Sequence, residues 1–263
     1  MSAAKLHYEI HEGEGPFLLL VHGILTGRSL WRSNLAALAR VARPVVVELW
    51  GHGRSPAPDD PALYHPDTFV RSFEEIRAEL TTDRWLLCGQ SLGAALTLRY
   101  SLEHPARVIA QIFTNSTSAL ADADWVASTR AHAPGLAEAL ASGGRAALER
   151  LPMHPVHAKR MPAASRAALL EDAARLDAGG VARLLRDTVP ESSLRDRVGE
   201  NRVPTLLVCG ERETRFARHR EFAERQMPRL EVAPVDAGHA VNVEAAESFD
   251  IAVTAFVRRC LRG

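Results

Sequence analysis

Gly89-Gln90-Ser91-Leu92-Gly93 is the stretch that decides the fold of this chain. The apolar run Trp85 to Cys88 before it predicts a buried strand, and the apolar stretch from Leu92 onward predicts a helix. A serine between two glycines at such a junction is typical of a sharp strand-to-helix turn that presents the serine hydroxyl above the sheet. The positive end of the helix would lie beside that oxygen and favour developing negative charge. We therefore predict that Ser91 is a nucleophile.

The rest of the chain alternates short apolar runs with longer amphipathic stretches, which is typical of βαβ units in a parallel sheet. Besides the run before Ser91, strands are predicted at Phe17–Val21, Pro44–Leu49, Val108–Phe113, Thr205–Cys209 and Leu230–Pro234. Helices are predicted at about 29–41, 67–80, 92–103, 217–226 and 245–259, and Leu6 to His11 alternates enough to be an antiparallel edge strand. The predicted fold class is α/β, with a mostly parallel sheet flanked by helices.

Residues 116–203 interrupt this rhythm. This stretch contains no convincing strand, and its Ala-, Leu- and Arg-rich segments are broken by prolines and by the pairs Gly143-Gly144 and Gly179-Gly180. We interpret it as several short helices that form a cap, with residues 1–115 and 204–263 forming the α/β core. Because the insertion leaves and re-enters at the carboxyl ends of strands, where open parallel sheets bind ligands, the cap is expected to roof the site.

A second candidate catalytic residue follows the last predicted strand. A serine alcohol is a weak nucleophile until a neighbouring base takes its proton. His239, in Gly238-His239, lies between the last strand and the last helix, so it should reach the same edge of the sheet as Ser91. We predict that His239 is the general base.

The third member of a catalytic triad holds the imidazole in the correct tautomer, and in α/β sheets of this kind it lies between the serine and the histidine in chain order. Glu213 follows the fifth strand of the parallel series and is the predicted acid. Glu211, two residues earlier, and Asp236, three residues before His239, are the alternatives.

When a serine attacks a carbonyl group, the carbonyl oxygen becomes negatively charged, and this oxyanion needs hydrogen-bond donors. The backbone N–H of Leu92, directly after the nucleophile, and that of Ile24, in the loop after His22-Gly23, are the predicted donors. His22 itself is interpreted as a structural residue, and Gly51-His52-Gly53-Arg54-Ser55 as a tight turn rather than a phosphate loop, because it lacks the Gly-Lys-Ser/Thr ending.

The composition limits the partners. The 32 basic and 32 acidic residues balance, which removes the usual electrostatic argument for nucleic acid or an anionic membrane. A small-molecule substrate is therefore expected. No apolar run approaches the roughly 20 residues of a membrane span, and the first 14 residues lack the apolar region of a secretory signal. We expect a cytoplasmic protein.

No cofactor or metal is predicted. Cys88, Cys209 and Cys260 form no CxxC pair, and reduced thiols fit best. His154 and His157 have ligand-like spacing, but Pro155 between them argues against a helix that displays both. Trp50 and Trp125 are predicted to bind substrate, with core packing as the alternative.

Together, the stretches around Gly23, Gly51, Ser91 and His239 resemble the α/β-hydrolase superfamily over essentially the whole chain. Gly210-Glu211-Arg212-Glu213-Thr214-Arg215-Phe216 is similar to the Gly-Glu-Arg-Asp-x-Lys-Phe stretch of the menaquinone-pathway synthases that eliminate pyruvate, in which the triad serves as a base. Those enzymes have Asp where this chain has Glu213, and an arginine for substrate carboxylates where it has Ala95. The resemblance implies a relative with a different substrate.

Three hypotheses about function follow. The first is hydrolysis of a small ester, thioester or lactone by Ser91, His239 and Glu213. The second is carbon–carbon bond cleavage or pyruvate elimination by the same residues. The third is a non-catalytic ligand receptor on the same fold, since a fold does not determine a function. A complete triad argues against the third, because a pure binder has no need of all three groups.

Overall fold

The computed structural model describes residues 4–262. Its centre is a seven-stranded sheet in the order β1-β3-β2-β4-β5-β6-β7, in which β1 is antiparallel to β3 and all other neighbours are parallel. The strands are β1 Tyr8–Ile10, β2 Phe17–Val21, β3 Arg43–Val47, β4 Trp85–Gly89, β5 Val108–Thr114, β6 Thr205–Gly210 and β7 Leu230–Val235. The predicted α/β fold class and the antiparallel edge strand are both confirmed.

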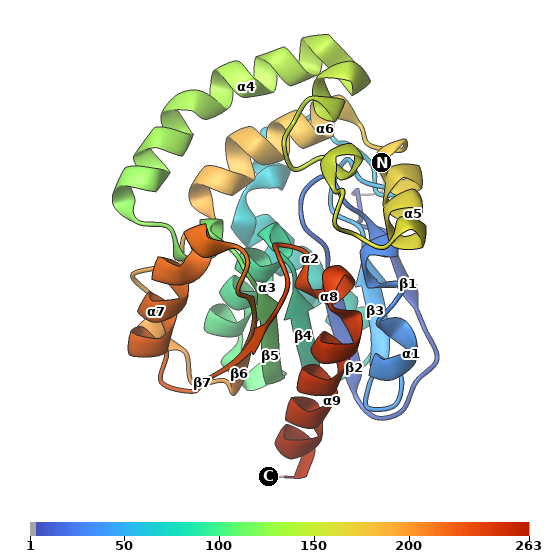
Figure 1. Cartoon of the computed structure of the whole chain (residues 1–263), viewed down its shortest axis with the longest axis vertical. Coiled ribbons are helices and arrows are strands. Elements are labelled where there is room, and N and C mark those ends of the chain that lie inside the picture. The colour runs from blue at the N-terminus through green and yellow to red at the C-terminus, as the bar shows by residue number, and fades with distance from the viewer. Residues whose placement is uncertain (1–3, 263) are drawn as a thin grey trace.

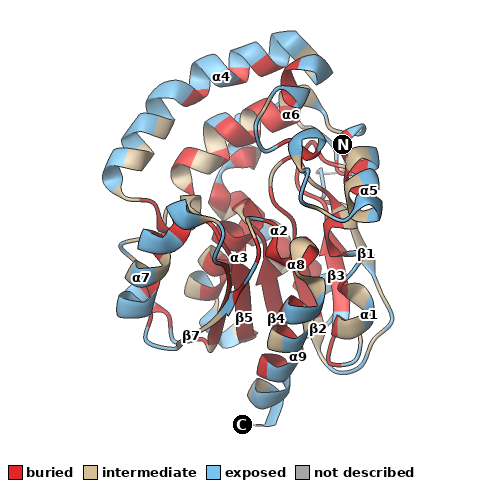
Figure 2. Ribbon diagram, viewed as in Figure 1, coloured by how far each residue is buried: buried red, intermediate tan, exposed pale blue. Residues whose placement is uncertain are grey.

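Alternation along the strands divides the core between the two faces of the sheet. In β2, Leu18 and Leu20 belong to one apolar cluster and Leu19 and Val21 to another, as a period of two requires. On the first face pack α1 (Leu35–Leu38) and α9 (Ala246–Arg262); on the second pack α2 (Pro66–Glu79) and α3 (Leu92–Glu103), with α7 (Ala217–Gln226) beside β6. Figure 2 shows the central strands buried between these helices, whereas the edge strands β1 and β7 are only partly buried.

The helix predicted over residues 29–41 is wrong in its extent. The chain instead forms a 3₁₀ turn at Arg28–Trp31 and the four-residue helix α1. Tertiary contacts explain the break. The buried Asn34 side chain donates hydrogen bonds to the Asn242 carbonyl and the Asp250 carboxylate, each at 2.9 Å, so the segment is held by its neighbours rather than by helical periodicity.

Residues 116–203 contain only helices and loops, and they lie over one end of the sheet (Figure 1). Their main helices are α4 (Ala123–Glu149), α5 (Ala163–Ala173) and α6 (Ala178–Arg183). The break expected at Pro134 is absent, because α4 continues through this proline. The predicted break at Gly143-Gly144 is present, because Gly144 has φ 54° and ψ −142° inside this helix.

Two contacts attach this cap to the core. Asp172 of α5 is almost completely buried and accepts a 2.8 Å hydrogen bond from the Ser29 amide. Leu25, in the loop after β2, packs in an apolar cluster with Leu140 of α4 and Val181 of α6. The cap boundary itself, at residues 116 and 203, stays a prediction, and the chain ends at residues 1–3 and 263 lie outside the described residues.

Between residues 4 and 262, no helix is both long enough and apolar enough to cross a membrane.

The remaining short helix of the core, α8 (Val241–Glu244), precedes α9 and follows the loop that carries His239.

Candidate active site

Ser91 lies in the turn between β4 and α3, at φ 53° and ψ −115°. A non-glycine residue with positive φ is strained and persists only where its surroundings require it. Here the flanking glycines allow the close packing that imposes the turn: a Cβ on Gly89 would lie 2.3 Å from the Gly93 carbonyl oxygen, and one on Gly93 would lie 2.2 Å from that of Val21. Ser91 therefore lies at the carboxyl end of β4. The strand order reverses between β2 and β4, because β3 follows on one side and β5 on the other, and open parallel sheets bind ligands at such a point.

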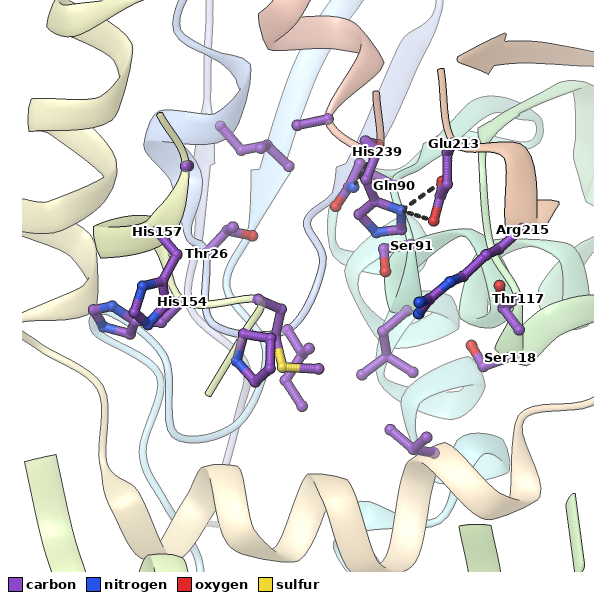
Figure 3. A pocket seen from close by; sticks show the side chains of 18 of the residues that line it. Thr26, Gln90, Ser91, Thr117, Ser118, His154, His157, Glu213, Arg215 and His239 are labelled. Atoms are coloured by element: carbon purple, nitrogen blue, oxygen red, sulfur yellow. Dashed lines mark hydrogen bonds and ion pairs between the residues drawn. The ribbon is translucent and has the colours of Figure 1, made fainter. Parts of the chain in front are cut away.

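His239 and Glu213 meet above Ser91 (Figure 3). The Glu213 carboxylate lies 2.9 and 3.0 Å from His239 Nδ1. Because a carboxylate only accepts, Nδ1 carries the proton and donates it, which leaves Nε2 free to accept a proton. Figure 3 shows the Ser91 side chain next to the imidazole ring, and all three residues line one pocket.

Asn115, at the end of β5, holds Glu213 in place. Its amide nitrogen donates to Glu213 Oε2 at 2.8 Å and to the Gly210 carbonyl at 3.0 Å, while its oxygen accepts from the Gly210 amide. Burial raises the pKa of Glu213, but the bonds from His239 and Asn115 outweigh it, so the pKa lies below its usual range. Glu213 is thus ionised at neutral pH and oriented from both sides.

The two alternative acids point elsewhere. Glu211 lies 3.7 Å from Arg220, and Asp236 forms a 2.9 Å ion pair with Arg212. Of the three carboxylates, Glu213 is the one that contacts His239.

The two amides predicted to bind an oxyanion, those of Ile24 and Leu92, belong to residues that line the same pocket as Ser91. Neither amide has an acceptor elsewhere in residues 4–262. Leu92 begins α3, where the first N–H groups have no helical partner. Both N–H groups therefore have no competing acceptor in the described part of the chain, as an oxyanion role would require.

Two buried histidines shape the loop that carries Ile24. His52 Nε2 accepts a 3.2 Å hydrogen bond from the Leu25 amide, and its Nδ1 bonds to the Trp50 carbonyl at 2.9 Å. Leu25 has φ 62°, so this bond holds a strained residue directly after Ile24. His22 makes the same kind of bridge, accepting from the Leu49 amide at 3.1 Å and bonding to the Gly23 carbonyl at 2.7 Å.

Burial lowers the pKa of His22 to about 4 and that of His52 to about 3. Both rings are therefore neutral near pH 7, and each uses one nitrogen as donor and the other as acceptor. His22 has the structural role that its sequence position indicated.

The loop of His239 is also held by side chains. Glu244 in α8 accepts hydrogen bonds from the Gly238 amide at 2.9 Å and the Ala240 amide at 3.3 Å, and the Gln90 side chain donates to the His239 carbonyl at 3.3 Å. Sequence reasoning missed Glu244, Asn115 and the contact of His52. The partners of Asn115 and the Leu25 amide that contacts His52 are far away in sequence, and the Glu244 contacts depend on how the His239 loop folds back, so no sequence pattern marks these residues.

The pocket above Ser91 has a volume of about 570 Å³. Its wall on the cap side is mostly apolar and consists of Trp125, Met153, Met161, Leu185 and Val189. His154 and His157 line it too, and each ring uses one nitrogen on a nearby backbone group: His154 Nδ1 accepts from the Val156 amide, and His157 Nε2 bonds to the Glu149 carbonyl. The cap side of the pocket therefore offers mainly apolar contact to a small ligand.

Of the two tryptophans predicted to bind substrate, Trp125 lines this pocket and Trp50 does not. Trp50 is buried in the core cluster with Phe69, and its indole N–H donates to the Leu63 carbonyl at 3.1 Å. Its apolar surface is thereby covered and its polar atom satisfied, so the prediction for Trp50 is wrong. Ala95 is likewise buried in the core and does not line the pocket.

A family model described as alpha/beta hydrolase fold matches residues 16–246. A protein of Bacillus subtilis named putative 2-succinyl-6-hydroxy-2,4-cyclohexadiene-1-carboxylate synthase is 27% identical over 256 residues, covering 93% of this chain and 92% of its own length.

Two solved structures are also similar. MenH from S. aureus superposes with a TM-score of 0.85 at 19% identity, covering 97% of this chain and 99% of the other. A hydrolase from Pseudomonas aeruginosa has a TM-score of 0.76 at 26% identity, covering 96% and 94%. The first likeness is one of fold alone.

Proposed function

Because the chain belongs to the alpha/beta hydrolase fold family, we propose that it is a serine hydrolase of a small ester, thioester or lactone. Ser91, His239 and Glu213 form its triad, and the N–H groups of Ile24 and Leu92 form its oxyanion hole. The observation that carries this proposal is the His239–Glu213 hydrogen bond directly above a strained Ser91.

The proposed reaction has two stages. Ser91 Oγ attacks the carbonyl carbon while His239 Nε2 takes its proton, and the oxyanion forms against the two amides. The bond to the alcohol or thiol then breaks, and that leaving group takes the proton from His239. Water attacks the resulting acyl-enzyme with His239 again as base, which releases the carboxylic acid and restores Ser91.

The second candidate is the elimination chemistry implied by the similarity to the Bacillus subtilis synthase. In that reaction His239 would remove a proton from the substrate through Ser91, and no acyl-enzyme would form. The same residues serve both reactions, so the two differ in whether Ser91 becomes covalently bound.

A fluorophosphonate probe and the variant Ser91→Ala test the proposal. We expect the probe to label the protein at Ser91, and we expect Ser91→Ala to abolish both labelling and turnover of p-nitrophenyl or coenzyme A esters. Retained turnover in Ser91→Ala would exclude the nucleophile. A protein that binds ligand but neither reacts with the probe nor turns over any ester or the synthase substrate would instead be a receptor.

A further inference from the structure

Arg215 is the one cationic side chain, within the described part of the chain, that lines the pocket above Ser91. It belongs to the 3₁₀ turn Thr214–Phe216, two residues after Glu213. Figure 3 shows its guanidinium extending from that turn into the pocket toward Ser91, on the same side of Ser91 as Thr117 and Ser118. The sequence does not predict that Arg215 lines the pocket, because the chain has many arginines and nothing in the sequence distinguishes this one as facing a ligand.

The two carboxylates that line the same pocket, those of Glu213 and Glu244, already have hydrogen-bond partners. Glu213 is bonded to His239 and Asn115, and the Glu244 carboxylate accepts two backbone amides of the His239 loop. Within residues 4–262, no ion pair or hydrogen bond involves the guanidinium of Arg215. The neighbouring arginines differ, since Arg212 pairs with Asp236 and Arg218 with Asp122.

A free guanidinium that projects into a pocket beside a nucleophile is suited to bind an anion, and its fork of N–H donors matches a carboxylate. The hydroxyls of Thr117 and Ser118, on the same side, supply further donors. Other lining residues, among them Trp125, Met153 and Met161, offer apolar contact. The pocket thus combines one cationic group with apolar surface.

We propose that Arg215 forms an anion subsite, and that the natural substrate carries a carboxylate on its acyl part in addition to the bond that Ser91 attacks. The hydrocarbon between the two groups packs on the cap residues. This inference rests on the proposed function for the identity of the reaction, but the subsite itself requires only that the ligand occupies the pocket.

Paired substrates of equal length test the subsite. Mono-p-nitrophenyl glutarate carries a terminal carboxylate, and p-nitrophenyl valerate ends in a methyl group instead. We expect the wild-type protein to prefer the glutarate ester, and Arg215→Gln to lower kcat/KM for it by about 10- to 100-fold while changing kcat/KM for valerate by less than about threefold. Arg215→Lys should restore part of the loss, and raised salt should weaken the preference.

Arg218→Gln is the matched control, because Arg218 lies three residues further along and is exposed, as Arg215 is, but does not line the pocket. It should leave the preference unchanged. If Arg215→Gln lowered the rates of both esters equally, or of neither, the subsite would be absent.

Calorimetry of glutarate binding to Ser91→Ala separates the two proposals. Binding that disappears in the double variant Ser91→Ala/Arg215→Gln supports the subsite even if neither ester is hydrolysed, in which case only the proposed function fails. Glutarate binding that persists in the double variant at the same affinity overturns the subsite.

Discussion

The loops of the core and the cap build the two halves of one pocket in different ways. On the core side, Glu213 and Ser91 are fixed by buried hydrogen bonds, close glycine contacts and strained backbone. On the cap side, the pocket wall consists mainly of apolar side chains such as Trp125 and Met153, and neither makes a side-chain hydrogen bond in the described part of the protein. The core half holds the atoms of Glu213 and Ser91 at fixed positions, whereas the cap half supplies apolar surface and determines the shape of the pocket.

The two halves are therefore suited to different tasks, one to the chemical step and the other to the selection of the substrate. Hydrogen bonds and steric limits act over tenths of an ångström, so the core half can orient a proton transfer. Apolar contacts are non-directional and tolerate substitution, so the cap half is suited to select the size of a substrate. Substitutions in the core loops should therefore change kcat, and substitutions in the cap should change KM.

The largest effect is expected for Glu213→Gln. The amide cannot hold His239 in the tautomer that leaves Nε2 free, and the corresponding change in a serine-protease triad lowers kcat by about 10⁴. We expect kcat for a p-nitrophenyl ester to fall by about 10³- to 10⁴-fold with little change in KM, measured by steady-state kinetics.

Glu211→Gln is the control for this variant, because Glu211 lies in the same loop but faces Arg220. Its kcat should stay within about twofold of the wild type. If Glu213→Gln retained more than a tenth of the activity, the assignment of the acid would be wrong.

A second prediction concerns acid stability of the core half. The pKa values of His22 and His52 in the folded protein, about 4 and about 3, lie below the unfolded value of 6.5. The unfolded chain therefore binds more protons below pH 6.5, and the free energy of unfolding falls as the pH drops. Each ring should cost about 2 kcal/mol between pH 7 and pH 5.

Urea unfolding of the wild type and of His52→Gln at both pH values measures this cost. The variant should lose about 2 kcal/mol less than the wild type over the same interval. Equal losses would show that His52 is not buried as a neutral ring.

The third prediction is a moderate loss of activity for His52→Ala at pH 7.5. Without the ring, the Leu25 amide and the Trp50 carbonyl lose their partner, and the loop that presents the Ile24 amide loosens. Direct removal of an oxyanion donor costs about 10²- to 10³-fold, so loss of a supporting group should lower kcat by about 10- to 100-fold.

His132→Ala provides the comparison, since His132 is exposed on α4 and bonds only to the Ser128 carbonyl. The kinetics are to be measured after circular dichroism shows that both variants are folded. A change in KM alone in His52→Ala would contradict a role in orienting the oxyanion loop.

The smallest effect is expected in the cap. Trp125→Ala removes an aromatic wall of the pocket without touching the triad. KM for p-nitrophenyl butyrate should rise by about three- to tenfold and kcat should remain within about twofold, with a smaller effect on the acetate ester. A loss of kcat as large as that of His52→Ala would remove the distinction between the two halves.

The core half is also the half that could be predicted from sequence. Ser91, His239 and Glu213 each follow a strand whose apolar run is evident, and parallel strands bring their carboxyl ends together. The helix predicted at 29–41 was wrong because Asn34 and Ser29 are held by α5, α8 and α9, which no local pattern reveals.

The cap half could be predicted only as helical. Which side chains of a helix face the pocket depends on how the helices dock. Trp125 was placed correctly in the pocket and Trp50 wrongly, although both are tryptophans near predicted loops. Arg215 lies in a motif of the sequence, but the motif does not predict that its side chain lines the pocket, because its direction is set by the turn Thr214–Phe216.

The most direct test of Ser91 as a nucleophile is detection of a covalent intermediate on its side chain. Mixing the enzyme with excess p-nitrophenyl acetate in a rapid-quench experiment, followed by intact mass and peptide mapping, reports whether an acetyl group is attached. We predict a burst of p-nitrophenol that approaches the enzyme concentration, with the acetyl group on the peptide containing Ser91. If acetate accumulates rapidly while no burst occurs and no acetyl group is found on Ser91, the result would contradict a nucleophilic serine.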